Sequence, residues 1–250
     1  MARLSSSAEP RAWRGARRPG PHELLVSEVF GPTIQGEGPS AGRPAVFVRL
    51  GACNLACAWC DTAYTWDGDR YDLSRELQVK ATGDVAREVL ALRPSLVILT
   101  GGEPALQSRE AARLAQTVTA GGAAIELETS GTVPLGALAN AVRLVVASPK
   151  LSSSAVRERA RLRWGVLAEI AALPHAVFKF VVQSPADLRE ADEVVARLGL
   201  VPGRVWLMPE ATDPAALGDG LRALAPHAAS RGWSLSSRLQ VAAWGDQRGR

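Results

Sequence analysis

Residues 51–62 read GACNLACAWCDT and contain all three cysteines of the chain, Cys53, Cys57 and Cys60. Thiolates are soft ligands that suit iron–sulfur clusters, zinc and Cu(I). A [4Fe–4S] cluster held by four cysteines is usually an electron carrier. Because this chain has no fourth cysteine, one iron of such a cluster would keep an open coordination site. The spacing therefore predicts a cluster that binds a small molecule at its fourth iron.

The competing interpretation of these cysteines is a Cys3His zinc site. The chain has three histidines, His22, His175 and His227, and none lies in the cysteine-containing stretch. A distant histidine could still complete a zinc site after folding. A non-enzymatic zinc-binding adaptor, whose basic N-terminus contacts RNA, is therefore kept as an alternative.

The composition is that of one globular domain with a basic end. Of the 250 residues, 47% are hydrophobic, which is enough to bury a sizeable core in a single domain. The net charge is +4, and much of the surplus lies in the first 18 residues, where a single acid, Glu9, is present with Arg3, Arg11, Arg14, Arg17 and Arg18. We expect a disordered basic tail over residues 1–22, a single domain over residues 23–250, and no direct nucleic-acid binding.

Two further absences in the sequence bear on the compartment. No apolar run approaches the length of a membrane-spanning helix, and the N-terminus lacks an apolar signal-peptide core. The odd number of clustered cysteines suits a reducing compartment. These features predict a cytoplasmic protein without a membrane partner.

Apolar runs alternate with helical patterns after the tail, which predicts an α/β fold with a mostly parallel sheet. About six or seven main strands suggest a partial (βα)6-type TIM-like barrel rather than a closed one. The expected strands are 25–30, 45–50, 96–99, 124–128, 144–147, 177–182, 205–208 and 233–236. The expected helices are 84–92, 109–119, 155–172, 185–198 and 214–229. The unusual motifs follow strand ends, where functional groups gather in such folds.

The cysteine spacing, with Trp59 just before the third cysteine, resembles the signature of the radical S-adenosylmethionine superfamily. In that family the position before the last cysteine lies near the cofactor's adenine. The stretch TGGEP at residues 100–104 resembles the family's glycine motif, whose backbone meets the methionine amino group. Glycines allow a backbone to approach a ligand closely.

Three more stretches resemble the 7-carboxy-7-deazaguanine synthase family: FGPTIQGEG at 30–38, FVR at 47–49 and DTAYTWD at 61–67. The resemblance runs from about residue 25 to the C-terminus. It implies conversion of 6-carboxy-5,6,7,8-tetrahydropterin to 7-carboxy-7-deazaguanine with loss of ammonia, in 7-deazapurine and queuosine biosynthesis. It also implies a [4Fe–4S] cluster, S-adenosylmethionine and Mg²⁺ as cofactors, a one-electron donor such as flavodoxin or ferredoxin, and a homodimer.

The resemblance also assigns roles to individual residues. Thr62 would ligate Mg²⁺, and Arg49 would hold the substrate carboxylate. The other substrate-binding residues would be Ile34, Gln35, Gly36, Glu37 and Thr100. The other cofactor-binding residues would be Gly102, Glu128, Ser148, Pro149, Lys150 and Gln183.

Each of these assignments has a structural alternative, and one position departs from the family pattern. Arg49 could form a structural ion pair, and Thr62 could cap a helix. The family commonly carries a histidine shortly before a Trp-Gly pair, where this chain has Gln240. An amide cannot carry a proton near neutral pH, so an acid–base role there is in doubt. A glycyl-radical-enzyme activating enzyme, which acts on a protein, remains an alternative enzyme class.

Overall fold

The computed structural model of the protein describes residues 17–250. Its framework is a single curved sheet in the order β3-β1-β2-β4-β5-β6-β7-β8-β9. Strand β2 and strands β4 to β9 are parallel to one another. Strand β1 runs antiparallel to both of its neighbours, β2 and β3. The strands are β1 (Glu23–Ile34), β2 (Pro44–Leu50), β3 (Gln78–Ala81), β4 (Leu96–Gly101), β5 (Ala124–Thr129), β6 (Leu144–Ala147), β7 (Ala176–Val182), β8 (Val205–Pro209) and β9 (Ser234–Leu235).

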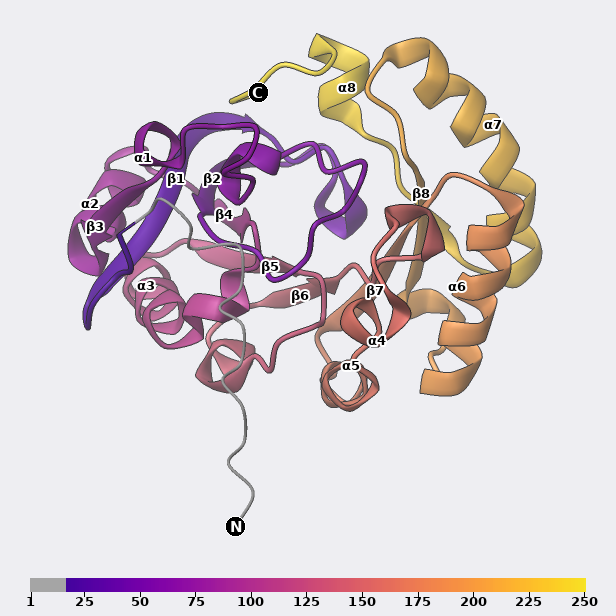
Figure 1. Ribbon diagram of the computed structural model, residues 1–250, viewed down its shortest axis with the longest axis horizontal. Helices are drawn as coiled ribbons and strands as arrows, with labels where there is room; N and C mark the ends of the chain where they lie inside the picture. Colours follow the sequence, from indigo (N-terminus) through magenta and orange to yellow (C-terminus); the bar gives the residue numbers. More distant parts are fainter. Residues whose placement is uncertain (1–16) are drawn as a thin grey trace.

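Most of the helices lie around the outer side of this sheet, as Figure 1 shows. The helices are α1 (Leu73–Glu76), α2 (Thr82–Ala91), α3 (Ser108–Ala120), α4 (Glu158–Arg161), α5 (Trp164–Ala171), α6 (Pro185–Leu198), α7 (Pro214–Arg231) and α8 (Leu239–Trp244). Short 3₁₀ helices include η3 (Ala63–Thr65) and η4 (Pro104–Gln107). The expected α/β fold with a mostly parallel, partial barrel is confirmed, and β3 and β9 form the two edges of the sheet in the described part of the chain.

The expected helix over residues 155–172 is wrong as a single element. The chain instead forms α4 and α5, joined by Leu162 and Arg163 with partly extended backbone angles. The side chain of Arg161 explains the break, because its Nε donates to Val156 O at 3.1 Å and its Nη1 to Lys150 O at 2.9 Å. These tertiary contacts outweigh the local helical preference.

The core explains why the apolar runs form strands. Every residue from Leu96 to Thr100 is buried, as expected for a strand that is covered on both faces. The outward side chains of β2, β4 and β5 pack against the helices in the main core cluster. On the inner side, Phe47 and Ile98 form a smaller cluster with Phe30. Phe30 and Phe47 stack with ring centroids 5.0 Å apart, and both line the central cavity described below.

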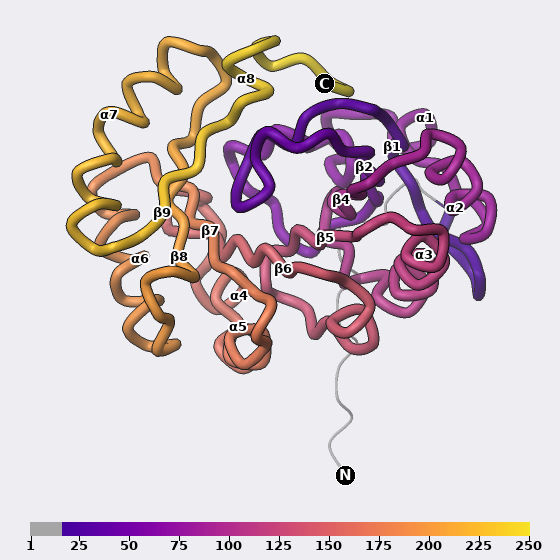
Figure 2. The backbone as a smooth tube through the Cα atoms, turned by 180° about the vertical axis from the view of Figure 1, so that it is seen from behind, coloured from indigo at the N-terminus to yellow at the C-terminus, as the bar shows by residue number. Residues whose placement is uncertain are grey.

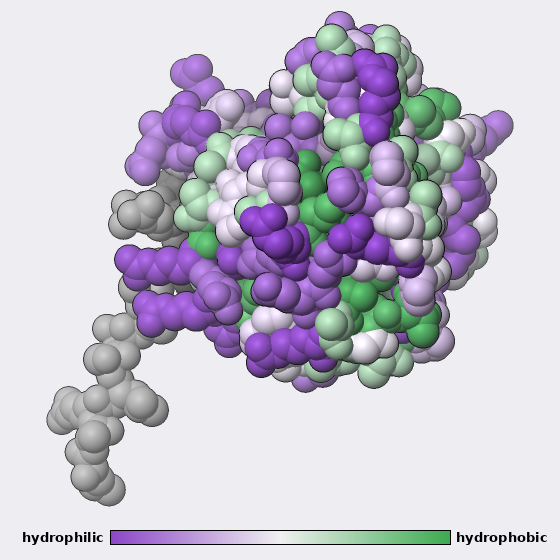
Figure 3. All heavy atoms as spheres, turned by 90° about the vertical axis from the view of Figure 1, so that its right-hand side faces the viewer, coloured by the Kyte–Doolittle hydropathy of each residue, from purple (hydrophilic) through white to green (hydrophobic). Residues whose placement is uncertain are grey.

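The last residues of the chain return to its beginning. Figures 1 and 2 both show the C-terminal segment after α8 beside the region of β1 and β2. Figure 3 shows the side of α6 and α7, where polar side chains dominate and apolar ones are visible in separate groups. Within residues 17–250, no helix is long and apolar enough to cross a membrane.

Residues 1–16 of the expected tail over residues 1–22 lie outside the described part of the chain. Of the remainder, Arg17 forms an ion pair with Glu23 at 2.5 Å. The His22 ring nitrogen lies 2.9 Å from Arg113 Nη1 on α3. The His22 contact connects the start of β1 with the helix layer.

Candidate functional site

A cavity of about 480 Å³ opens where the parallel strands end. The loops after β2, β4, β5 and β6 meet there, as expected for a sheet whose carboxyl ends share one edge. Pro149 and Gln183 are not among the lining residues, and the Gln183 backbone N–H is bonded to Asp187 Oδ2 at 3.0 Å. The predicted site residues that line the cavity are Ile34, Gln35, Gly36, Glu37, Arg49, Cys53, Cys57, Trp59, Cys60, Thr62, Thr100, Gly102, Glu128, Ser148 and Lys150.

The three cysteines lie on the loop that follows β2, and all are free thiols. The Trp66 indole Nε1 donates to Cys60 Sγ at 3.3 Å. Burial raises the pKa of Cys53 and of Cys57, and the nearby Lys150 charge partly opposes this at Cys57. Both thiols are therefore protonated near neutral pH until a metal displaces the protons.

Their arrangement fits an iron–sulfur cluster. Among residues 17–250, no three His, Cys, Asp or Glu side chains converge as ligands of one metal ion. A [4Fe–4S] cube presents a separate iron to each thiolate, so its ligands need not converge on one point. Three soft donors on one loop, with an indole N–H directed at one sulfur, are a suitable donor set for such a cluster.

The glycine motif lies directly against the cysteine loop. Gly101 has φ +136°, and a Cβ there would lie 2.1 Å from Leu50 O. A Cβ on Gly102 would lie 2.0 Å from Ala52 O. The Gly102 backbone N–H donates to Leu50 O at 3.0 Å. Only glycines allow the two loops to pack this closely.

Glu103 fixes the same motif to the next strand. The residue is fully buried. Its carboxylate accepts hydrogen bonds from Thr129 Oγ1 at 2.8 Å, from Ser130 N at 2.8 Å and from Ser130 Oγ at 2.5 Å. It also accepts from Ala105 N at 3.0 Å, at the start of η4. The ends of β4 and β5 are thereby joined into one unit.

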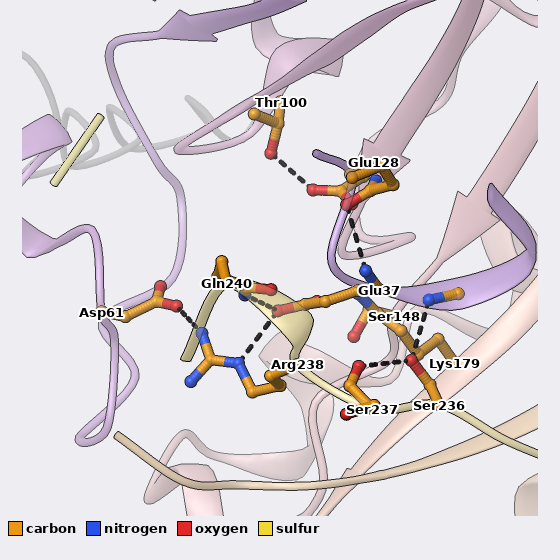
Figure 4. Close-up of polar contacts among 12 residues, drawn as sticks. Glu37, Asp61, Thr100, Glu128, Ser148, Lys179, Ser236, Ser237, Arg238 and Gln240 are labelled. Atoms are coloured by element: carbon orange, nitrogen blue, oxygen red, sulfur yellow. Dashed lines mark hydrogen bonds and ion pairs between the residues drawn. The ribbon is translucent and has the colours of Figure 1, made fainter. Parts of the chain in front are cut away.

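Glu37, a predicted substrate-binding residue, is the centre of a buried polar network. The sequence did not predict the network itself. Its Oε1 accepts from Arg238 Nε at 2.9 Å and from Gln240 Nε2 at 2.8 Å, and its Oε2 pairs with Lys179. Burial alone would raise the pKa of Glu37, but the charges of Lys179 and Arg238 outweigh it and lower the pKa well below its usual range. Arg238 Nη2 also donates to Asp61 Oδ2 at 2.5 Å, as Figure 4 shows. Glu37 is thus held as a carboxylate.

Gln240 stands at the position where the sequence resemblance implied a histidine. Its Oε1 is buried and has no hydrogen-bond partner among the described residues. A Cβ on Gly36 would lie 1.5 Å from that oxygen. The absence of a side chain at Gly36 is therefore what lets Gln240 reach Glu37.

A second polar chain joins the loop after β1 to the ends of β4 and β5. Glu128 accepts from Gln35 Nε2 at 3.2 Å through Oε1 and from Thr100 Oγ1 at 2.8 Å through Oε2. These contacts bring two predicted substrate residues to one predicted cofactor residue. Elsewhere in the cavity, Lys150 Nζ lies 5.4 Å from the centre of the Trp59 ring and 3.3 Å from Ser148 Oγ.

Two of the structural alternatives have definite outcomes. Arg49 does form an ion pair, with its Nε 2.7 Å from Glu28 Oε1, and it also lines the cavity. Thr62 precedes η3, but its side chain makes no capping hydrogen bond. The Thr62 Oγ1 instead lies 3.7 Å from Cys60 Sγ and lines the cavity.

Sequence reasoning also missed several lining residues, including Lys179 and Arg238. A signal existed for Lys179, because it is a single charge inside the apolar run AVFKFVV. A lysine buried in a strand needs a compensating partner. The identity of that partner, 142 positions earlier in the chain, carries no local signal.

The chain is similar to known proteins in both sequence and fold. Residues 48–204 match the family model of the Radical SAM superfamily. The 7-carboxy-7-deazaguanine synthase of Pyrobaculum aerophilum is 38% identical over 230 residues, which cover 91% of this chain and 97% of that protein. The 7-carboxy-7-deazaguanine synthase of Rhodopirellula baltica is 34% identical, with 94% and 92% covered. The crystal structure of QueE from Escherichia coli superposes with a TM-score of 0.66 at 27% identity, covering 92% of this chain and 98% of that one.

Proposed function

The chain belongs to the radical S-adenosylmethionine superfamily and, within it, to the 7-carboxy-7-deazaguanine synthase family, and we propose on that basis that it forms 7-carboxy-7-deazaguanine from 6-carboxy-5,6,7,8-tetrahydropterin with loss of ammonia. The observation that carries the proposal is the shared cavity. One set of three thiols, the glycine motif and the Gln35–Glu37 loop all line it. We infer carbon–nitrogen lyase chemistry, in the 7-deazapurine (queuosine) pathway.

The residues around the cysteines would bind the cofactors. The cluster and S-adenosylmethionine supply the one-electron chemistry of the reaction when bound. Cys53, Cys57 and Cys60 would hold the cluster. The backbone of Gly101 and Gly102 would meet the methionine part of the cofactor. Trp59, Glu128, Ser148 and Lys150 would surround the rest of it. The buried Nε1 of Trp59 has no hydrogen-bond partner among residues 17–250 and offers one donor.

The opposite side of the cavity would bind the pterin. Gln35 and Glu37 have the amide and carboxylate groups that pair with the amide and amino edge of such a ring. Arg49 would hold the substrate carboxylate, since its Nε is taken by Glu28 while its two terminal nitrogens have no hydrogen-bond partner within residues 17–250. Thr62 would ligate Mg²⁺ together with that carboxylate.

The chain's own residues also restrict solvent. Phe30, Phe47 and Tyr64 line the cavity. The C-terminal residues 245–250 line it as well. Apolar walls and a covering segment would keep water away from a reactive substrate.

One anaerobic assay tests the proposal. The reconstituted protein is incubated with dithionite, S-adenosylmethionine, Mg²⁺ and 6-carboxytetrahydropterin, and mass spectrometry measures 7-carboxy-7-deazaguanine. We expect product without any partner protein, which a glycyl-radical activating enzyme would not give. A C57S variant serves as the control without activity. Formation of 5′-deoxyadenosine without the deazaguanine would reject the proposed substrate.

Metal analysis tests the cluster itself. The proposed enzyme should contain iron and sulfide and absorb broadly near 400 nm, whereas a zinc-binding adaptor would be colourless. A sample that bound zinc alone would overturn the assignment. The homodimer, the flavodoxin- or ferredoxin-type donor and the cytoplasmic location stay predictions.

A further inference from the structure

Glu28, on β1, has a carboxylate that three side chains share. Its Oε1 accepts from Arg49 Nε at 2.7 Å and from the Tyr64 hydroxyl at 2.9 Å. Its Oε2 accepts from Arg248 Nε at 3.1 Å. Burial alone would raise the pKa of Glu28, but the Arg49 charge and these hydrogen bonds lower it. The group is therefore a carboxylate throughout the physiological range.

The bonds on Oε1 determine how Arg49 is presented to the cavity. Arg49 and Glu28 are each only about one-sixth exposed, at 15% and 16%. The guanidinium centre lies 5.6 Å from the centre of the Phe30 ring. The bond from Nε to Glu28 restrains the planar guanidinium, and its two terminal nitrogens remain for a carboxylate. Such a fork can bind a carboxylate through two parallel hydrogen bonds.

The bond on Oε2 holds a different part of the chain. Arg248 belongs to the six residues after α8, all of which line the cavity. Its Nη1 donates to Glu76 Oε2 at 2.7 Å, and its guanidinium lies 3.9 Å from the centre of the Tyr64 ring. In the described chain, Arg248 makes all the side-chain hydrogen bonds found for residues 245–250. The C-terminal segment is thus fixed over the cavity by one side chain.

We infer that Glu28 is a positioning residue with two duties: it aims Arg49 at the carboxylate of the substrate, and it anchors the C-terminal segment over the cavity. The inference rests on the proposed function for the identity of that carboxylate. Glu28 itself touches neither substrate nor cofactor in this scheme. The two duties use different oxygens, so they can be separated experimentally.

The experiment measures two quantities in the same samples. One is the preference for a ligand that carries the carboxylate over one that lacks it, and the other is how firmly the C-terminal segment is held over the cavity. Equilibrium dialysis under argon gives the affinities of the reconstituted full chain for 6-carboxypterin and for pterin, which lacks the carboxylate. Hydrogen exchange followed by mass spectrometry reports protection of residues 245–250. In E28Q, we expect the preference for 6-carboxypterin to fall roughly 10-fold to 100-fold, since a charge-assisted hydrogen bond orienting Arg49 is lost. Exchange of the C-terminal segment should rise in the same variant.

Two further variants separate the duties. R248A removes the anchor but leaves the Glu28–Arg49 pair, so C-terminal exchange should rise while the carboxylate preference stays within about twofold. Y64F removes one donor to Oε1 and keeps the ring beneath Arg248, so the preference should fall by roughly twofold to fivefold. Y64F also keeps the inference testable if E28Q does not fold.

The outcomes distinguish two kinds of failure. A wild-type protein without any preference for 6-carboxypterin would reject the proposed substrate and this inference with it. A clear wild-type preference that persists in E28Q and Y64F would overturn the positioning role alone. An equal loss of preference in R248A and E28Q would also overturn it, because Glu28 would then act only through the C-terminal segment.

Discussion

Arg238 joins Glu37 to Asp61, with its Nε 2.9 Å from Glu37 Oε1 and its Nη2 2.5 Å from Asp61 Oδ2. The loop that would bind the pterin and the loop that carries the cysteines are therefore connected by one guanidinium (Figure 4). Its Nη1 donates to Ala211 O at 2.5 Å. Solvent screens the pair with Glu37 only weakly, because the two side chains are 8% and 14% exposed, whereas Asp61 is 42% exposed.

Replacing Arg238 by methionine should destabilise the fold. Breaking a buried ion pair by removing one partner costs about 3–5 kcal/mol, and because Lys179 still faces Glu37 we expect roughly 2 kcal/mol. Urea unfolding of the two proteins measures the difference. R222M is the matched control, since Arg222 pairs with Asp219 where both side chains are about three-quarters exposed. A loss in R238M no larger than in the control would show that the network does not stabilise the fold.

The lowered pKa of Glu37 predicts a specific acid sensitivity. The pKa of Glu37 in the folded state lies below the ordinary value of 4.5. Its contribution to the free energy of unfolding is therefore fully present above pH 4.5 and is lost as the pH falls toward the folded-state pKa. The stability difference between wild type and E37Q should therefore shrink by about 1.4 kcal/mol for each pH unit below 4.5. Urea unfolding of both cluster-free proteins between pH 5.5 and 3.5 measures it. A constant difference would contradict the assignment.

Gly36 and Gln240 should behave as a coupled pair. G36A places a methyl group on Gln240 Oε1, and the amide can move only by giving up its bond to Glu37. We expect G36A to cost about 1–3 kcal/mol. Adding Q240A should recover part of this, with a coupling energy of roughly 1 kcal/mol in a double-mutant cycle. G83A is the control, because a Cβ there meets no atom of the described residues within 4 Å. Strict additivity would mean that the two residues do not meet.

Trp66 should tune the cluster rather than hold it. Removing the Nε1–H bond to Cys60 Sγ with W66F leaves the three thiols in place. Because an N–H donor favours the more negative, reduced state, its loss should lower the reduction potential, by roughly 50 mV for about 1 kcal/mol. Spectroelectrochemistry of the 400 nm band measures this. W206F, whose indole Nε1 has no partner in the described residues, should leave the potential unchanged.

The parts of the fold that sequence predicted are those with a strong local pattern. The buried runs, such as 96–99 and 177–182, have both faces covered and show continuous apolar residues. Helix α6 begins where predicted, because Ser184 caps it and Pro185 starts it, and Gly199 ends it with φ +62°. Strand β3 was missed because QVKA is a short edge segment with no buried residue.

In the candidate site, too, the sequence predicted the local motifs but not the contacts between distant segments. The cysteine spacing and the glycine motif are local, and both reach the cavity as predicted. The Glu37 network depends on Lys179 and Arg238, which approach only because the sheet curves and the chain returns after β9. Arg49 was predicted, but its pairing with Glu28 follows from the register of β1 and β2, which places the two residues opposite each other. Long-range pairing is what local patterns leave open.

The buried Glu103 carboxylate has a thermodynamic consequence for cofactor binding. Its four hydrogen bonds immobilise the backbone of the glycine motif while the protein folds. S-adenosylmethionine would therefore meet a glycine-motif backbone that is already ordered. Its binding should then carry little entropic penalty for ordering that loop. Replacing Glu103 by the shorter aspartate would leave the glycine-motif backbone less ordered in the folded protein. The entropic penalty of ordering it would then fall on cofactor binding instead of on folding.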